Sequence, residues 1–501
     1  MNITLRKGNL EEQECDLLIV NEFAKWTKFG GATKAVDDKF DERLSKIAKE
    51  EGFKAGRSET LLVRTFDGFP AKRILLVGLG DQKEFSSQVV REVSATAYQA
   101  AKNLRANKIV SILHGAGFGS LPAMECGRAQ MEGLRLGAYE FVKLKKTPEE
   151  KPHEVKSWEI VTSNGNHARL AKRGMELGEI VAQGTIFARD LVNEPAMEMT
   201  PKNLTRVAEA VAKNSGGSVK VKLLMRDEMK KLGMGGVLGV AQGSDHGPVF
   251  VHMEYKAPKA RKRVSIVGKA VTFDSGGLSL KPAEYMTHMK CDMAGAAAVL
   301  GIFSVLAELK PRVHVDGIFA AVENMPSGTA IRPGDVLKAM NGKTMEVLNT
   351  DAEGRLTLAD ALSYASTLKP HYLVDLATLT GACMAALGEE ISGLMGNDPD
   401  FNTKLMTTAT QAGESLWSLP LEKRYRRLID SKVADLQNVG GKYGGAITAG
   451  LFLQEFVSEG ISWAHIDIAG PAFAQTPMNP YTQYGGTGAG VATMIEFLRS
   501  I

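Results

Sequence analysis

Along the first third of the chain, apolar runs typical of strands alternate with the apolar spacing typical of helices. Short apolar runs with strand-like composition are separated by helical patterns such as the one at 90–103. The predicted strands lie at 16–20, 60–64, 73–78, 109–113 and 157–161. A charged segment at 143–156 is predicted to be a loop. This order of elements is typical of an α/β fold, in which helices cover a mostly parallel sheet.

A helical pattern at 167–191 is longer than any other in the sequence, and strands and helices continue to alternate after it. With 501 residues the chain is too long for one ordinary hydrophobic core. We therefore expect two α/β domains with a boundary near residue 165.

The segment 349–356, Asn-Thr-Asp-Ala-Glu-Gly-Arg-Leu, concentrates charge between a predicted strand and a predicted helix. Asp351, Glu353 and Arg355 occupy alternate positions, which point the same way in an extended or tightly turned segment. Two carboxylates held that close are unfavourable unless a cation lies between them. A solvated loop with an incidental ion pair is the alternative interpretation.

A second stretch places charges in largely apolar surroundings. Lys269 and Asp274 follow the strand-like 264–267, Lys281 comes soon after, and Asp292 precedes a small-residue helix. Buried charges usually have a partner. Carboxylate oxygens suit Mg²⁺, Mn²⁺ or Zn²⁺, and the four carboxylates of the two stretches are more than one ion needs. Two ions that share bridging carboxylates are the natural hypothesis.

These two stretches resemble the signatures of the leucyl aminopeptidase family, which are dinuclear metallo-exopeptidases of the cytosol. The resemblance extends over about residues 170–501 and holds at every charged position of both motifs. It implies a more variable N-terminal α/β domain (1–165), a linking helix (166–195) and a larger catalytic α/β domain (196–501). It also implies a homohexamer.

The resemblance implies a role for each charged residue. Asp274 and Glu353 should bridge both ions, Asp292 and the Lys269 amine should complete one shell, and Asp351 should belong to the other. The ions would be Mn²⁺ or Zn²⁺, with Mg²⁺ or Co²⁺ also admitted at an exchangeable site. A lysine ligand must be neutral, so nearby dications must depress its pKa strongly.

The expected reaction is release of N-terminal residues from peptides by a water activated between two ions. One ion would hold the free α-amine of the substrate. Lys281 would stabilise the developing oxyanion. A bicarbonate bound by Arg355 is implied as the proton carrier, since the sequence offers no obvious side-chain base.

An apolar specificity pocket is expected, which would favour leucine and similar side chains. Met289 lies three residues before Asp292 and could line it. The resemblance implies that Thr378 and Gly381 also line the pocket and that Leu379 offers its carbonyl to the substrate.

Composition narrows the alternatives. Four cysteines lie far apart without a paired motif, and the N-terminus lacks the apolar core of a secretory signal, so a cytoplasmic, reducing location is expected. No apolar run approaches membrane-spanning length. The nine histidines show no paired ligand spacing. The glycines at 78 and 80 lack the third glycine of a dinucleotide fingerprint, so we expect an ordinary turn there.

Two other functions remain as alternatives. A two-metal phosphohydrolase would use similar carboxylates, but it would not choose a lysine ligand and should carry a phosphate-binding glycine loop. An additional DNA-binding role is known in some bacterial relatives. The formal net charge of +4 does not call for it.

Overall fold

The computed structural model describes residues 1–66, 68–117, 121–146 and 153–501. Its contacts divide the chain into two compact units. Unit 1 comprises Met1–Ala182 and Pro477–Gln483, and unit 2 comprises Gln183–Thr476 and Tyr484–Ile501. The division at 165 and 195 stays a prediction. Part of the predicted loop 143–156, namely 147–152, lies outside the described residues.

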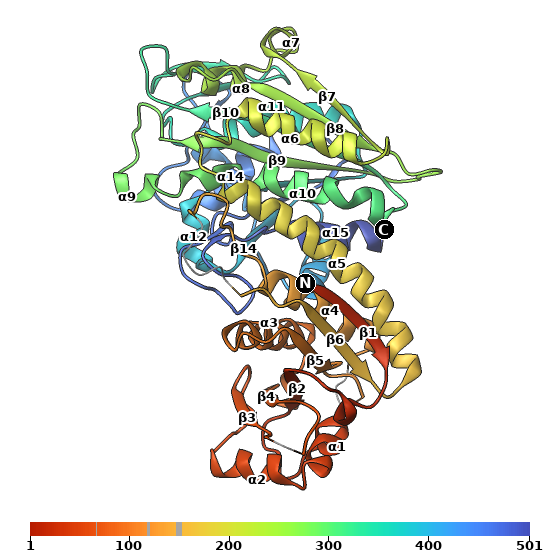
Figure 1. The fold of residues 1–501 in the computed structure, drawn as a ribbon. Coiled ribbons are helices and arrows are strands. Elements are labelled where there is room, and N and C mark those ends of the chain that lie inside the picture. The colour runs from red at the N-terminus through yellow and green to blue at the C-terminus, as the bar shows by residue number, and fades with distance from the viewer. Residues whose placement is uncertain (67, 118–120, 147–152) are drawn as a thin grey trace. The chain divides into compact units, whose positions relative to one another are not determined.

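Unit 1 is built on a six-stranded sheet in the order β1-β6-β5-β2-β4-β3 (Figure 1). Its strands are parallel except β3, which is antiparallel to β4. The strands are β1 (Asn2–Lys7), β2 (Leu17–Glu22), β3 (Thr60–Arg64), β4 (Arg73–Gly78), β5 (Lys108–Ile112) and β6 (Ser157–Thr162). The helices are α1 (Gly31–Lys39), α2 (Arg43–Glu50), α3 (Ser87–Asn103), α4 (Ala123–Gly137) and α5 (Gly165–Asn193), whose last turns belong to unit 2.

Strand β2 shows why this sheet is covered on both faces. Leu17 and Ile19 pack in one core with α3 and α4, whereas Leu18 and Val20 pack in a second core with α1 and α2. Successive side chains of a strand point to opposite faces, so a continuous apolar run requires cover on both sides. The apolar run that predicted this strand therefore also encodes its central place in the sheet.

Unit 2 contains an eight-stranded sheet in the order β15-β14-β17-β13-β9-β10-β8-β7. Its four central strands, β17, β13, β9 and β10, run parallel. The strands are β7 (Val219–Leu224), β8 (Val249–Tyr255), β9 (Arg263–Asp274), β10 (His314–Asn324), β13 (Tyr372–Ala377), β14 (Ser392–Gly396), β15 (Leu416–Ser418) and β17 (Ser462–Asp467). Short strands in two small sheets are β11 (Val336–Lys338), β12 (Thr344–Glu346), β16 (Leu436–Gln437), β18 (Phe473–Ala474) and β19 (Gly485–Gly486).

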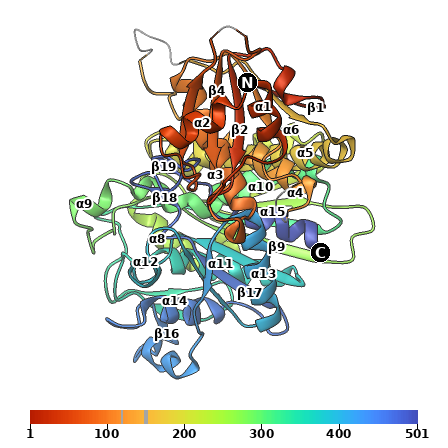
Figure 2. The same cartoon turned by 90° about the horizontal axis from the view of Figure 1, so that it is seen from below.

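Helices of unit 2 pack on both faces of the large sheet (Figures 1 and 2). Val267 of β9 packs in the core formed with α11, whereas a Cβ on the next residue, Gly268, would collide with the backbone of Gly295 in α10. The helices are α6 (Pro201–Asn214), α7 (Arg226–Lys231), α8 (Gly235–Val240), α9 (Ala283–Met286), α10 (Ala294–Leu309), α11 (Gly354–Thr367), α12 (Gly381–Leu387), α13 (Pro399–Ala412), α14 (Gly445–Gln454) and α15 (Val491–Ser500).

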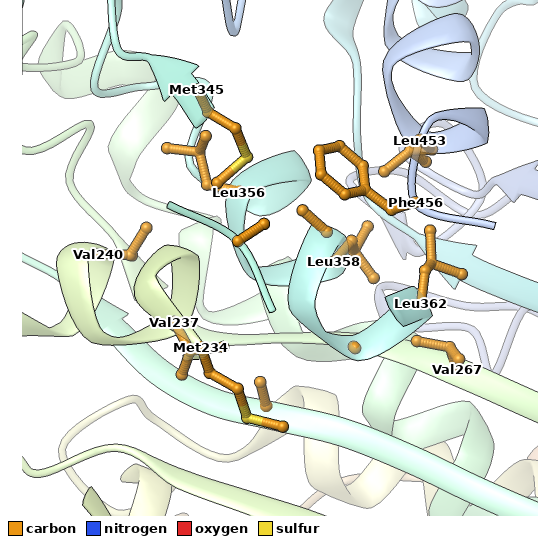
Figure 3. Close-up of a cluster of buried hydrophobic side chains, with 14 of the residues drawn as sticks. Met234, Val237, Val240, Val267, Met345, Leu356, Leu358, Leu362, Leu453 and Phe456 are labelled. Atoms are coloured by element: carbon orange, nitrogen blue, oxygen red, sulfur yellow. The ribbon is translucent and has the colours of Figure 1, made fainter. Parts of the chain in front are cut away.

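Helix α11 is buried on nearly all sides, which fixes the segment that precedes it. Leu358 and Leu362 lie one turn apart and join a core that contains Val267, Leu453 and Phe456 (Figure 3). The first turn of α11 therefore has little freedom to move.

The predicted fold class is confirmed: a smaller N-terminal α/β unit and a larger α/β unit with a mostly parallel central sheet. Among the described residues, no helix combines the length and the apolar character needed to cross a membrane.

Candidate metal centre

Strand β9 supplies two of the predicted ligands near its carboxyl end. Lys269 is buried in the strand, and Asp274 is its last residue. Asn324, the last residue of the neighbouring strand β10, pairs with Asp274 across a register shift and donates to its Oδ1 at 2.8 Å. The carboxyl ends of parallel strands are the usual location of sites in α/β proteins.

The two motif stretches are tied together by hydrogen bonds. The Thr350 hydroxyl donates to the carbonyl of Gly276 at 2.6 Å and accepts from the amide of Ser279 at 2.8 Å. The Ser279 hydroxyl in turn accepts from the amide of Thr350. These contacts bring Asp351 and Glu353 to the end of β9. Carboxylate oxygens of Asp274, Asp351 and Glu353 all lie within 4.8 Å of one another.

Two lysines lie among these carboxylates. The Nζ of Lys269 is 2.7 Å from Asp292 and 2.9 Å from Glu353, and it donates to the carbonyl of Thr378 at 2.9 Å. Its side chain is only 4% exposed.

The Nζ of Lys281 lies 2.9 Å from Asp274 Oδ2 and 2.5 Å from Asp351 Oδ1. The seven predicted ligand and catalytic residues therefore include six that form one connected cluster. They are Lys269, Asp274, Lys281, Asp292, Asp351 and Glu353.

The donor set fits divalent cations. Four carboxylates outnumber the two ammonium groups that contact them. Among the described residues, the buried Oδ2 of Asp292 has no hydrogen-bond donor, whereas Asp351 Oδ1 and Glu353 Oε1 are each contacted by a lysine ammonium group. Buried carboxylate oxygens without donors are costly, and hard metal ions are their usual partners.

The charges in the cluster shift one another's pKa values. Burial lowers the pKa of Lys269, but the carboxylates of Asp292, Glu353 and Asp274 outweigh it and raise the pKa above the ordinary lysine value. Burial raises the pKa of Glu353 and Asp292, and the charge of Asp274 adds to the effect. Each group therefore depends on its neighbours for its charge state.

Arg355 lies in the first turn of α11 and is buried. One guanidinium nitrogen donates to the carbonyl of Asn438 at 2.8 Å, whereas its buried Nε has no hydrogen-bond partner within the part of the chain that the structure describes. Burial lowers the pKa of Arg355 to about 10, opposed by the charges of Glu353 and Asp467. A buried guanidinium with a free donor is suited to hold a small anion.

Sequence comparison decides the family. The model of the cytosol aminopeptidase family catalytic domain matches residues 186–495, and the model of that family's N-terminal domain matches 20–148. The chain belongs to the cytosol aminopeptidase family.

Relatives agree with this family over the full length of the chain. A probable cytosol aminopeptidase of Alkaliphilus oremlandii (strain OhILAs) is 41% identical over 502 residues, with both chains covered completely. One from Aquifex aeolicus (strain VF5) is 43% identical over 461 residues, or 92% of this chain and 91% of the relative.

Solved structures share the fold. A tomato leucine aminopeptidase mutant matches with a TM-score of 0.89 and 35% identity, over 100% of this chain and 97% of that chain. The bottromycin maturation enzyme BotP in complex with Mn matches with a TM-score of 0.85 and 34% identity, over 97% and 99% of the two chains. The predicted family and enzyme class are confirmed, and the protein is a metal-dependent aminopeptidase, a hydrolase.

Of the residues predicted to bind the substrate of this cytosol aminopeptidase family member, one contacts the cluster directly and the others lie on neighbouring segments. Thr378 contacts it directly, because its hydroxyl donates to Asp292 Oδ1 at 2.8 Å and its carbonyl accepts from Lys269. Leu379 donates its amide to Asp467, and Gly381 begins α12 with open space where a side chain would stand. Met289 is half-buried at the start of the 3-10 turn that carries Asp292.

Three polar residues hydrogen-bond to the predicted site residues or to the segments that carry them. These three residues were assigned no role from the sequence. Asn324 orients Asp274, and Asp467 accepts from the amide of Leu379 and the hydroxyl of Thr380. The side-chain oxygen of Asn438 accepts from the backbone amides of residues 348 and 349, and its side-chain nitrogen donates to the carbonyl of residue 349. Their only sequence signal is a polar residue at the end of an apolar strand or in a loop.

A second group of potential ligands in the same unit is an ion-pair network. Glu254, His314 and Asp316 come close enough to hold a cation. However, Arg263 binds both oxygens of Asp316 at 2.6 and 2.8 Å, and His252 contacts it at 2.9 Å. The positive charge that a metal would supply is thus already provided by a side chain. The prediction that the histidines are not metal ligands stays a prediction.

Proposed function

We propose that this aminopeptidase releases N-terminal residues, preferably leucine and other apolar ones, from peptides with a free N-terminus. One observation carries the proposal: four carboxylates and two lysines converge at the carboxyl end of β9, so the carboxylates outnumber the ammonium groups beside them by two. This arrangement suits hydrolysis assisted by two divalent cations. It also supports peptide hydrolysis over the phosphohydrolase alternative, because a lysine belongs to the donor set.

The residues that would hold the ions are Lys269, Asp274, Asp292, Asp351 and Glu353. When bound, two divalent ions, Mn²⁺ or Zn²⁺ with Mg²⁺ or Co²⁺ as alternatives at one position, would supply an acidified water and Lewis acidity. Asp274 and Glu353 would bridge the two positions. Lys269 would bind through a neutral amine, so its ammonium proton must leave when the ions enter.

Lys281 is proposed to act on the substrate. Its ammonium lies between Asp274 and Asp351 at the edge of the cluster, and its side chain is more exposed than that of Lys269. A cation in this place can donate a hydrogen bond to the oxygen of the scissile carbonyl as negative charge develops there. The neighbouring carboxylates raise its pKa against the effect of burial, which keeps the proton on Nζ.

Arg355 is proposed to hold a bicarbonate. Its buried Nε has no protein partner among the described residues, and a planar guanidinium matches a planar oxyanion with paired hydrogen bonds. Bound there, bicarbonate would supply a base for the proton of the attacking water. Asn438 would keep the guanidinium in place through its carbonyl.

The specificity pocket is proposed to be formed by Met289, Thr378 and Gly381, with the carbonyl of Leu379 accepting from the substrate. The open space at Gly381 supports this proposal, because a side chain of the substrate needs room beside the cluster. Half-buried Met289 offers an adaptable apolar wall.

The assembly and location are proposed to be a homohexamer in the cytoplasm. The family resemblance supports both proposals, and the widely spaced cysteines support the location. A DNA-binding role remains an alternative, which a salt-dependent gel shift on duplex DNA would test.

The deciding experiment is hydrolysis of leucine p-nitroanilide by chelator-stripped protein after Mn²⁺, Zn²⁺, Mg²⁺ or Co²⁺ is added back singly. N-acetyl-leucine p-nitroanilide is the matched control, because acetylation removes the free amine. We expect activity to return with metal and to vanish on acetylation. A folded, metal-loaded protein that hydrolyses no substrate in a panel of aminoacyl anilides would overturn the proposal.

A further inference from the structure

Unit 1 contains a cavity that the peptidase chemistry does not use. Its volume is about 670 Å³, and every residue that lines it belongs to unit 1. This volume lies within the range of about 300–1,000 Å³ that is usual for small-molecule sites. The predicted metal ligands all belong to unit 2, so the cavity is a separate feature.

The cavity lies at the carboxyl ends of the parallel strands of unit 1. Its walls include the segments that follow β1, β2, β4, β5 and β6. The chain passes from β2 to β4 on one side of β2 and then returns to β5 on its other side. The gap between β2 and β5 is therefore the point where the strand order reverses. Ligands of open α/β sheets bind at such switch points.

One part of the cavity wall is rich in groups that bind anions. The loop after β2 contributes Lys28, an exposed lysine, and leads into α1 at Gly31, whereas the amide of Gly30 already donates to the Glu22 carboxylate. Across the switch point, the loop after β5 contributes Gly115 and Gly117, both with positive φ. Glycines of this kind allow a ligand to approach the backbone amides closely.

Aromatic rings form another part of the wall. Phe23 packs edge-to-face on Phe85, and Trp26 stacks on Phe29 with ring centroids 4.5 Å apart. The indole nitrogen of Trp26 also donates to the carbonyl of residue 53, which fixes the ring. Half-buried, immobilised rings that line a cavity are suited to stack on a planar base.

Glu22 adds an acceptor at the end of β2. Its carboxylate accepts from the amides of Phe23 and Gly30 and lines the cavity. In dinucleotide-binding α/β folds an acidic side chain of this kind hydrogen-bonds the ribose hydroxyls. Anion-binding loops, fixed aromatic rings and a carboxylate together match phosphate, base and ribose.

We propose that this cavity binds a nucleoside diphosphate. The diphosphate would face Lys28 and the glycine loops, the base would stack on Phe23 or Trp26, and the ribose would reach Glu22. The site needs no metal ion from the catalytic cluster, since none of those ligands lines it. It also does not depend on the glycines at 78 and 80 acting as a dinucleotide fingerprint.

The test is isothermal titration calorimetry of the full-length protein with ADP, adenosine or inorganic diphosphate. Each compound is titrated into the metal-loaded and into the chelator-stripped protein. We expect one ADP per chain in both forms, with adenosine and diphosphate each binding more weakly. Lys28→Glu should weaken ADP binding about tenfold or more, because it removes a charge-assisted contact. Lys46→Glu, a reversal of another exposed lysine of unit 1 outside the cavity wall, is the matched control and should leave the affinity unchanged.

Hydrogen exchange locates the site independently of any variant. Bound ADP should slow exchange in peptides that cover 22–36 and 112–117. Absence of saturable ADP binding, or binding that disappears with the metal ions, would overturn the proposal. So would equal affinity for ADP and inorganic diphosphate, or equal effects of the two lysine variants. Hydrogen exchange of peptides from β4 and β6 of unit 1, measured without ADP, should be the same in the Lys28→Glu variant and the parent protein, which reports that unit 1 of the variant is folded.

Discussion

At the residue scale, Lys269 keeps its position because Gly354 has no side chain. A Cβ at residue 354 would lie 2.4 Å from Cε and 2.6 Å from Nζ of Lys269. The lysine is buried and is held by Asp292, Glu353 and the carbonyl of Thr378, so it cannot move aside without breaking those contacts. The glycine of the octapeptide is thus required by its packing against Lys269, a proposed metal ligand.

We therefore expect Gly354→Ala to displace the Lys269 amine and to lower both metal affinity and kcat about 10–100-fold, as changes next to metal ligands typically do. Isothermal titration with Mn²⁺ and leucine p-nitroanilide kinetics measure the two effects. Gly328→Ala is the control, since a Cβ at residue 328 meets nothing within 4 Å. Normal metal affinity and turnover in Gly354→Ala would show that the lysine is not a ligand.

Lys281→Ala separates oxyanion stabilisation from metal binding. The substitution removes a donor beside Asp274 and Asp351 but leaves the carboxylates in place. We expect kcat to fall on the order of 10²–10³-fold while the metal content, measured by plasma emission spectroscopy, stays unchanged. A parallel loss of metal would contradict the role proposed for Lys281.

The charged residues of the candidate site could be singled out from the sequence. The polar residues that hydrogen-bond to them could not. Lys269, Asp274 and Glu353 stand out because charge interrupts apolar patterns. Asn324 and Asp467 carry no such signal, since a polar residue at a strand end is ordinary. Their roles arise from strand pairing across 50 and more residues, which only the folded sheet reveals.

At the scale of elements, the strand-to-helix turn was predicted, but its detailed geometry was not. The prediction from alternate positions assumed an extended or tightly turned segment over 351–355, whereas α11 already begins at Gly354 and Glu353 has helical dihedral angles. Side chains therefore stop alternating in direction at Glu353, and the direction of the Arg355 side chain is set by the first turn of α11. Strand β9 was predicted at 264–267, whereas it begins at Arg263 and continues past the charged Lys269 to Asp274. The order of the strands in the sheet had no sequence signal.

The amino ends of β9 and β10 carry an ion pair whose stability effect depends on pH. Arg263 on β9 binds Asp316 on β10 through two hydrogen bonds, and these strands also carry Lys269 and Asp274. Despite burial, the contacts with Arg263 and His252 lower the pKa of Asp316 from 3.8 to about 2. We expect Asp316→Asn to lower the free energy of unfolding at pH 7 by about 2 kcal/mol.

The sign of this effect follows from the lowered pKa. A carboxylate that ionises more readily in the folded state stabilises that state above its unfolded pKa, and the stabilisation is lost as protons bind to it. The difference between parent and variant should therefore shrink between about pH 4 and pH 2, where the Asp316 carboxylate becomes protonated. Urea denaturation at several pH values measures it. A difference that stays constant or grows between pH 4 and pH 2 would rule out this linkage.

At the scale of the whole molecule, the two units have separate cores. Unit 1 encloses one core on each face of its six-stranded sheet, and the predicted metal ligands all lie in unit 2. A ligand that binds only the folded state stabilises it by about 2.7 kcal/mol at a concentration 100-fold above its Kd. Local opening in the region that holds the ligand is suppressed by the same free energy.

Removal of the ions should therefore affect hydrogen exchange unevenly along the chain. We expect chelation to speed exchange in peptides from β9, the segment 289–293 and the start of α11. These segments carry the proposed ligands, whose negative charges repel one another when no cation is bound. Peptides from β2, β4 and β5 of unit 1 should keep their rates and serve as the internal control. The Glu353→Ala variant, which lacks a carboxylate proposed to bridge the ions, should show fast exchange with or without Mn²⁺. If chelation changed neither set of peptides in the parent protein, the metal ions would contribute nothing to the stability of the cluster, and the four carboxylates would have to be held by their lysine partners alone.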